Sequence, residues 1–413
     1  MTMALPHKPI LRGLEPTPIQ HEGRSMLLLR DPSGVSDAEL VISRAAVAVL
    51  HLFDGEHTIE DIQASILKDH GTLLEREQLE ALVRRFDDAY FLEGATFDAR
   101  KSAVEADYRN AARRPFVHSG IAYPDDPLEL RAWFEALNTV PEAKPREGAR
   151  LCGAAVPHID LRFGGASNAC AHRLLAAAAP LADTVIVLGT GHKAIDDPFT
   201  LTRVPYATPL ADVPNDLEFV DALAARIGPE RAYRAELLHR EEHSIEFQAI
   251  FVALRNQARD RPLSIVPVLV GSFHEFIERE RDPIEDDRIA TFVGAARDEA
   301  KRLGRNVLVV SSIDLAHLGP RYGDPTGLDP DRAHDVEVAD RELLEFAARG
   351  DAGGFFEHNA ACNDERRICG FSALYTQLRI LRGARGTLLR YDQTTFPGSR
   401  DTVSHCSMVF EAP

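Results

Sequence analysis

The sequence predicts an α/β protein in which helices flank a sheet, preceded by a small winged-helix-like domain. After about residue 150, short apolar runs typical of strands alternate with segments of helical periodicity, which favours a sheet with helices on its faces. The first hundred residues lack this alternation, and their pattern predicts one strand followed by three helical segments. We therefore expect domains over residues 1–98 and 116–413, joined by a charged connector over residues 99–115.

Composition narrows the class of protein. The 413 residues are 45% hydrophobic and 27% charged, as in soluble globular proteins, and the net charge of −17 argues against binding to nucleic-acid backbones. Five cysteines without a C-x-x-C pair predict neither a disulfide framework nor a zinc ribbon, so we expect a reducing, cytoplasmic setting. The most apolar run, residues 174–188, contains Pro180 and Asp183 and is too short to span a bilayer, so no membrane association is expected.

The N-terminal elements follow from local signals. Thr58 is a favourable N-cap with Asp61 three residues later, and Gly71 is a favourable helix end. In order, we expect a strand over residues 25–30, a turn over 31–34, helices over 40–53, 58–70 and 75–90, and a short wing over 91–97.

A winged helix most often binds DNA, but the charge of this segment opposes that use. Residues 30–98 contain 15 Asp and Glu against 6 Lys and Arg, a net charge of −9, with no basic recognition face. Residues 20–98 resemble instead the PqqD-like peptide-binding domain of pyrroloquinoline-quinone biosynthesis. The resemblance implies a peptide ligand that adds a strand to an exposed sheet edge.

The second domain shows the alternation most clearly. Apolar runs predict strands over residues 151–156, 184–188, 263–270 and 307–310, and helical periodicity predicts helices over residues 169–182, 217–227 and 245–257. Open α/β sheets place their ligands at the carboxyl ends of the strands. The polar residues that follow these runs are therefore the candidates for a functional site.

Three histidines and one cysteine stand out at such positions. His158 follows the first run, His192 the second and His317 the fourth, and Cys369 precedes a helical segment whose N-terminus favours a thiolate. Each histidine alone is more often a structural residue, but together they predict a metal site. Imidazole and thiolate suit Fe(II), Zn(II) or Cu(I). We expect the other four cysteines to be small buried hydrophobes: Cys152, Cys170, Cys362 and Cys406.

A second motif covers residues 241–246. Ser244 is an expected N-cap of the following helix, and Glu246 in its first turn complements the helix dipole. These local roles leave Glu242 and His243 unexplained, and both could face a site at the same sheet edge.

The order of the motifs identifies residues 115–413 as resembling the Memo family, whose fold is similar to that of class III extradiol dioxygenases. The matching elements are His118-Ser-Gly-Ile-Ala-Tyr123-Pro124, Val156-Pro-His158, Leu188-Gly-Thr-Gly-His192, Glu242-His-Ser-Ile-Glu246, Ile265-Val-Pro-Val-Leu-Val-Gly271, Ser311-Ser-Ile-Asp314-Leu-Ala-His317, Ile368-Cys-Gly370 and Asp401-Thr-Val-Ser404. The sequence departs from the family pattern at Ala122, where Trp is common, at Lys193, where a second His is usual, and by the extra Ile313.

The resemblance implies roles for individual residues. His158, His192 and Cys369 occupy the positions of metal ligands, and His317 that of a catalytic acid/base. We also expect Asp314, Glu242 and His243 to contribute to catalysis. Fe(II) is the expected metal, with Cu or Zn as alternatives.

Two functions remain open on this basis. The first is an iron- or copper-dependent oxidoreductase related to the extradiol dioxygenases, although a thiolate ligand, itself oxidisable, makes plain ring cleavage less expected. The second is a non-enzymatic metal-binding or peptide-binding adaptor. Bacterial members resemble protein B of the AmmeMemoRadiSam system, which implies radical-SAM and AMMECR-type partners.

Overall fold

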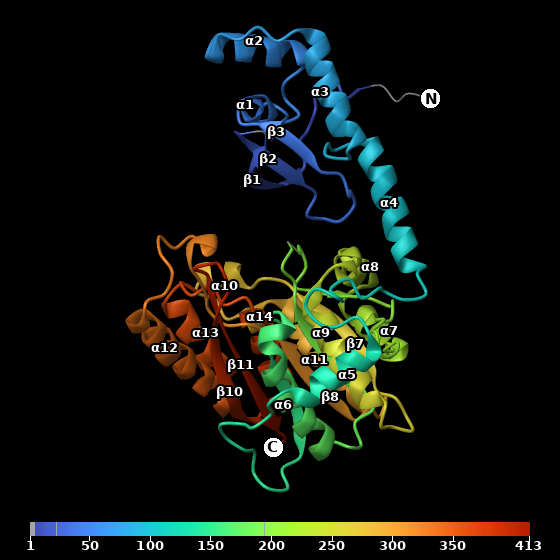
Figure 1. Ribbon diagram of the computed structural model, residues 1–413. Coiled ribbons are helices and arrows are strands. Elements are labelled where there is room, and N and C mark those ends of the chain that lie inside the picture. Colours follow the sequence, from blue (N-terminus) through green and yellow to red (C-terminus); the bar gives the residue numbers. More distant parts are fainter. Residues whose placement is uncertain (1–4, 22, 194) are drawn as a thin grey trace. The chain divides into compact units, whose positions relative to one another are not determined.

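The computed structural model describes residues 5–21, 23–193 and 195–413, and the chain forms two compact units, Met1–Asn110 and Ala111–Pro413 (Figure 1). Among the described residues, no helix has both the length and the apolar composition needed to cross a membrane.

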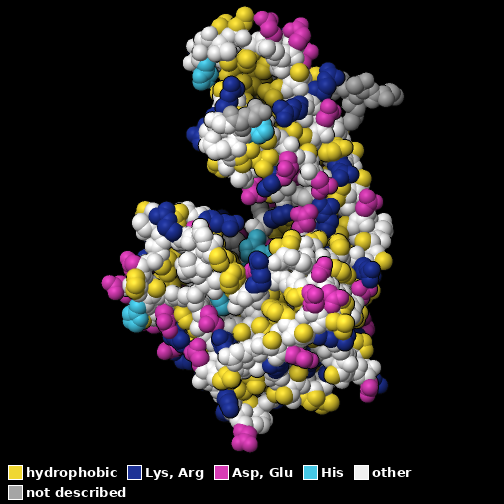
Figure 2. All heavy atoms as spheres, viewed as in Figure 1, with side chains coloured by type: hydrophobic (Ala, Val, Ile, Leu, Met, Phe, Trp, Pro, Cys, Tyr) yellow, Lys and Arg dark blue, Asp and Glu magenta, His cyan; other side chains and the backbone are white. Residues whose placement is uncertain are grey.

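The first unit combines a small sheet with four helices. Its antiparallel strands, in the order β1-β2-β3, are β1 (Glu15–His21), β2 (Arg24–Arg30) and β3 (Leu40–Ser43). The helices that follow are α1 (Ala46–Leu50), α2 (Ile59–His70), α3 (Arg76–Asp88) and α4 (Ala95–Arg109). The core between them includes Ile62, Val83, Phe86 and Phe91, all fully buried. On the face drawn in Figure 2, acidic and basic side chains are interspersed over this unit.

Two of the expected helices are confirmed. The Thr58 hydroxyl accepts a hydrogen bond from the backbone N–H of Asp61, the Asp61 carboxylate accepts one from the N–H of Thr58, and Gly71 ends α2 with φ of 65°. The expected helix over residues 75–90 corresponds to α3.

Two N-terminal predictions are wrong. Residues 40–43 form β3 instead of the start of a helix, because they pair with β2, where Val41 lies opposite Leu28. Helix α1 is correspondingly short. Residues 91–97 do not form a wing, because α4 begins at Ala95. Most of the expected connector over residues 99–115 also lies within this helix. The Arg12 guanidinium packs over the ring of Phe97 in its first turn.

The second unit is built on one large mixed sheet, which confirms the expected fold class. Its strands are β4 (Leu151–Val156), β5 (Thr184–Thr190), β6 (Phe199–Leu201), β7 (Ser264–Val270), β8 (Val307–Ser312), β9 (His317–Leu318), β10 (Arg385–Thr395) and β11 (Thr402–Glu411). The order is β10-β11-β4-β8-β5-β7-β6, with β9 beside β11. Strands β4, β8, β5 and β7 are parallel and correspond to the four predicted apolar runs.

Helices cover both faces of this sheet (Figure 1). They are α5 (Pro127–Ala136), α6 (Leu161–Ala178), α7 (Leu217–Ile227), α8 (Pro229–Tyr233), α9 (His243–Asn256), α10 (His274–Glu278), α11 (Asp287–Arg302), α12 (Pro330–Arg349), α13 (Ala352–Ala361) and α14 (Phe371–Ile380). Because side chains alternate along a strand, Val185 and Val187 pack with α6 and α9, whereas Ile186 and Leu188 pack in the cluster of α7, α11 and α14. The parallel strands bring the residues after β4, β5 and β8 to one edge.

Candidate metal centre

His158 lies two residues beyond β4, and its ring orientation is fixed by hydrogen bonds. Its Nδ1 lies 2.9 Å from the carbonyl oxygen of Ser312, and because a carbonyl only accepts, Nδ1 carries the proton. The other nitrogen, Nε2, lies 3.2 Å from Sγ of Cys369. His158 is buried, and the same nitrogen also lies 3.6 Å from a carboxylate oxygen of Asp314.

His192 follows β5 and is held by Glu242. Both carboxylate oxygens of Glu242 lie 3.1 Å from Nδ1 of His192, and one also accepts the backbone N–H of His192 at 3.2 Å. The ring meets that of His158 nearly edge to face, with centroids 4.9 Å apart. A carboxylate that orients a histidine in this way is typical of residues surrounding a bound metal.

Cys369 is presented by a tight loop before α14. A Cβ on Gly370 would lie 2.3 Å from Cβ of Ile313, so only glycine permits this approach of the loop to the end of β8. Asn363, Asp364 and Arg367 in the same loop adopt the left-handed conformation, with φ of 48–53°. The structure thus holds the sulfur at the carboxyl edge of the sheet, before a helix, as predicted.

Three overlapping groups of donor atoms form the candidate metal centre. The donor atoms within each group lie within 4.8 Å of one another, and the groups are His158, His192 and Cys369; His192, Glu242 and His243; and Asp314, His317 and Cys369. Nitrogen and sulfur ligands about 2.0–2.1 Å and about 2.3 Å from one ion would lie roughly 3.1–3.6 Å apart for bond angles of 90–109°. The observed separation of 3.2 Å between His158 and Cys369 fits this range.

The electrostatics favour a thiolate among imidazoles. Burial would raise the pKa of Cys369, but the surrounding His158 and His317, together with a hydrogen bond from His192, hold it well below its usual value. Burial likewise opposes charge on His192, yet the Cys369 thiolate and the Glu242 carboxylate raise the pKa of His192 well above its usual value. This mutual stabilisation requires the thiolate form, which is also the form that binds metals.

His317 and Asp314 form the third donor group together with Cys369. Nδ1 of His317 donates to the carbonyl of Leu315 at 2.9 Å, and although burial opposes it, the Cys369 and Asp314 charges raise the pKa of His317 to about 9. One oxygen of Asp314 accepts the backbone N–H groups of His158 and Ile159, each at 3.1 Å. Asp314 therefore ties the loop after β8 to the loop after β4.

The expected N-cap at Ser244 is wrong. Glu242 caps α9 by accepting the N–H of Ser244 at 3.0 Å, while the Ser244 hydroxyl donates to the carbonyl of Thr190 at 2.9 Å and joins α9 to β5. The adjacent His243 stacks on His192 at 4.8 Å and 18°, and burial lowers the pKa of His243 despite its contact with Glu242. Glu242 and His243 do face the sheet edge, as expected.

Glu246 has a structural role that the sequence did not indicate. Its buried carboxylate forms an ion pair with the buried Arg114 and accepts hydrogen bonds from the Tyr123 hydroxyl at 2.5 Å and the His118 N–H at 2.9 Å. These contacts fasten the segment that opens the Memo-like region onto α9. The sequence feature that could have indicated this role is a glutamate placed on the buried face of the helix.

A cavity of about 300 Å³ adjoins the donor atoms. His192 and Cys369 line it, and its polar and apolar lining further includes Phe273, His274, Ile277, Arg367 and Phe371. Of the three departures from the family pattern, Lys193 is turned toward Glu241, with Nζ 3.1 Å from its carboxylate, and Ala122 and Ile313 are buried.

The comparisons with known proteins identify the family of this chain. The family described as Memo-like protein matches residues 114–409. A MEMO1 family protein of Aquifex aeolicus is 28% identical over 93% of this chain and 95% of its own length, and one of Thermus thermophilus is 26% identical over 81% and 93%. A MEMO1 family protein of Methanosarcina mazei is 27% identical over 67% of this chain and 88% of its own length. The matched region contains every donor residue of the centre described above, and the chain belongs to the Memo-like protein family.

Proposed function

We propose that the protein is a metal-dependent oxidoreductase related to the extradiol dioxygenases, with Fe(II) as its metal and copper as the main alternative. The observation that supports this proposal is the convergence of His158, His192 and Cys369, with Nδ1 of each histidine engaged elsewhere and Nε2 left for a metal. Hydrogen-bond partners that fix the orientation of histidine rings are expected around a metal site. Three side chains that served only in packing would not need their rings oriented in this way.

The donor set bears on the chemistry. Two imidazoles and one thiolate leave coordination positions open, as in catalytic and not in closed structural sites. A bound iron or copper ion would supply one-electron redox chemistry there. The adjoining cavity of about 300 Å³ has room for a small substrate beside His192 and Cys369.

The chain's own residues would orient groups and move protons. Glu242 keeps Nδ1 of His192 protonated and so directs Nε2 inward. His317 holds a proton at Nδ1 against the carbonyl of Leu315, which leaves Nε2 to exchange a proton with a substrate. Asp314 keeps His158 in place through its backbone and therefore acts as a positioning residue.

Oxygen uptake tests this function. Protein purified and loaded with Fe(II) under anaerobic conditions should consume O₂ in the presence of at least one member of a panel of catechols, small thiols and phenols. The His317→Ala variant, loaded to the same metal content, should not. Metal retention without oxygen uptake on the whole panel would favour the second candidate, a metal-holding or adaptor protein, which the thiolate ligand also suits.

Partners are a further part of the proposal. We expect radical-SAM and AMMECR-type proteins to act with this chain, and the first unit to bind a peptide by strand addition. The match to the Aquifex relative covers 93% of the chain, more than the second unit alone, so it extends into the first unit. Pro16 and Pro18 each remove a backbone donor from edge strand β1, which favours the β3 edge for an added strand.

A further inference from the structure

A second cavity, of about 290 Å³, lies between α5, α6 and α9, and its lining differs from that of the metal centre. None of the metal-centre donors contributes to it. Three arginines line it, one from each helix: Arg131, Arg173 and Arg255. Glu135 is the one acidic residue of the lining, so the cavity carries an excess of positive charge in a chain whose net charge is −17.

These arginines have no carboxylate partner among the described residues. Arg173 donates to the Thr139 hydroxyl and the Phe134 carbonyl, at 3.0 and 2.8 Å, and Arg255 donates to the Ala179 carbonyl at 2.6 Å. Arg131 makes no such contact within the described ranges. Burial and the neighbouring Arg259 lower the pKa of Arg255 to about 10, so it remains charged at neutral pH without a compensating anion.

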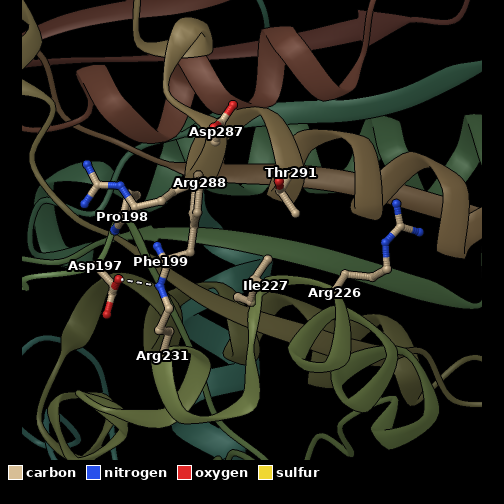
Figure 3. A pocket seen from close by; sticks show the side chains of 9 residues that line it. All are labelled: Asp197, Pro198, Phe199, Arg226, Ile227, Arg231, Asp287, Arg288 and Thr291. Carbon is tan, nitrogen blue, oxygen red and sulfur yellow. Dashed lines mark hydrogen bonds and ion pairs between the residues drawn. The ribbon is translucent and has the colours of Figure 1, made fainter.

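The cavity in Figure 3 shows the opposite arrangement. It is also lined by three arginines, but Arg231 lies 3.0 Å from Asp197, Arg226 lies 3.0 Å from Glu299, and Arg288 lies 2.8 Å from Asp286. Those guanidinium groups are already neutralised by carboxylates of the same chain. The arginines between α5, α6 and α9 instead form no ion pair within the described residues, so their positive charge and their remaining N–H donors are available to an anion.

Apart from the arginines, Glu135 and Gln257, the lining of the cavity is apolar or aromatic. The rings of Phe134 and Phe251 lie 4.8 Å apart at 63°, and His172 stacks on Phe251 at 4.7 Å and 9°. Burial lowers the pKa of His172 to about 4, so this ring is neutral and adds a flat surface instead of a charge. Leu254 also lines the cavity.

We propose that this cavity is a second ligand site, which binds a small organic anion: a carboxylate or phosphate monoester carried on an aromatic or apolar group. The guanidinium groups of Arg131, Arg173 and Arg255 would bind the anionic end, and Phe134, Phe251 and His172 would pack against the apolar end. The volume accommodates one ring with its acidic substituent and excludes a large cofactor.

Calorimetric titration of the full-length, metal-free protein tests this site with phenyl phosphate and benzoate as probes. At least one should bind with a dissociation constant below 1 mM. Benzamide, which has the ring without the charge, and inorganic phosphate, which has the charge without the ring, should each bind at least tenfold more weakly. Absence of binding by both anions, or equal binding of inorganic phosphate and phenyl phosphate, would overturn the proposal.

Substitutions locate the site. Arg131→Met, at an exposed position, and Arg255→Met should each weaken binding of the better probe at least tenfold. Arg231→Met, in the cavity of Figure 3, is the matched control and should not change it, and Cys369→Ala should retain binding because the metal centre is separate. If Arg255→Met does not fold, the binding measured with Arg131→Met still tests whether the probe occupies this cavity. Loss of binding in Cys369→Ala but not in Arg131→Met would assign the probe to the metal centre and contradict the proposal.

Discussion

Glu242 holds His192 from two directions, accepting the ring N–H at Nδ1 at 3.1 Å and the backbone N–H at 3.2 Å. The same carboxylate caps α9 by accepting the N–H of Ser244. One side chain therefore fixes the helix start, the loop after β5 and the tautomer of a candidate ligand. Its pKa is held well below the usual value, since burial is outweighed by the contacts with His192 and His243.

Glu242→Gln should weaken metal binding about 10–100-fold, because an amide is a poorer partner for the His192 ring and orients it less firmly. Competition with a chelator of known affinity measures this change. The matched control is Glu241→Gln, the same substitution one residue earlier, where the carboxylate contacts Lys193 and Arg240 instead of a ligand. Equal affinities for the two variants would show that Glu242 does not support the site.

Cys369→Ala should abolish thiolate coordination. Co(II)-loaded wild-type protein should show sulfur-to-metal charge-transfer absorption, and the variant should lose it together with most of its affinity, since the remaining two imidazoles bind far more weakly. Cys362→Ala, in the same loop, should leave the spectrum unchanged, because its thiol donates to the Asn359 carbonyl. Wild-type affinity should fall as pH drops, because protons compete with the metal for the histidine ligands, and the raised pKa of His192 makes this competition begin at a higher pH than for an ordinary histidine.

Cys369→Glu should restore a two-histidine, one-carboxylate donor set. Harder oxygen ligands favour Fe(II) over Cu(I), so the variant should retain iron and lose copper. Metal analysis after parallel anaerobic loading with each ion and desalting measures the ratio. An unchanged iron-to-copper ratio relative to wild type would mean that residue 369 does not determine the metal preference.

His317→Ala should separate proton transfer from metal retention. The ring interacts with Cys369 but does not belong to the donor group of His158 and His192, so the variant should keep most of its metal while losing about 10²–10⁴-fold in any turnover. His158→Ala provides the comparison for ligand loss. Equal metal loss in the two variants would make His317 a ligand.

The sequence predicted that His158, His192 and Cys369 would lie together, because His158 and His192 follow strands that are recognisable individually. His158 and His192 directly extend apolar runs, and parallel pairing necessarily brings such positions together. The features that the sequence did not predict depend on contacts between residues far apart in the chain. Residues 40–43 become a strand only through β2, and the buried ion pair of Arg114 and Glu246 joins residues 132 positions apart. The prediction of an N-cap at Ser244 was wrong because Glu242, which contacts the distant residue His192, occupies the capping position.

The first unit should bind peptide and not DNA. Its segment over residues 30–98 has a net charge of −9, which repels phosphates instead of releasing counterions. Full-length protein should therefore show no retention of a random duplex at physiological salt in a fluorescence anisotropy titration. Submicromolar, salt-sensitive duplex binding would refute this prediction.

Acid should destabilise the second unit through His239, which is fully buried. Its Nε2 donates to the Thr200 carbonyl at 3.1 Å, its Nδ1 accepts from the Tyr206 hydroxyl at 2.9 Å, and burial lowers its pKa to about 3. The unfolded chain, with a histidine pKa near 6.5, takes up a proton below that pH while the folded state does not. The contribution of neutral His239 to the free energy of unfolding is therefore complete above pH 6.5. It decreases by about 1.4 kcal/mol per pH unit as pH falls toward 3.

Urea unfolding of the full-length protein between pH 7 and pH 4.5 measures this slope. His239→Gln should be less stable than wild type at pH 7, because two buried partners lose their hydrogen bonds, but its stability should fall less steeply with acid, by about one proton. His334→Gln, at an exposed position, is the control and should keep the wild-type slope. If His239→Gln and wild type lose stability in parallel, His239 is not the group that takes up the proton on unfolding.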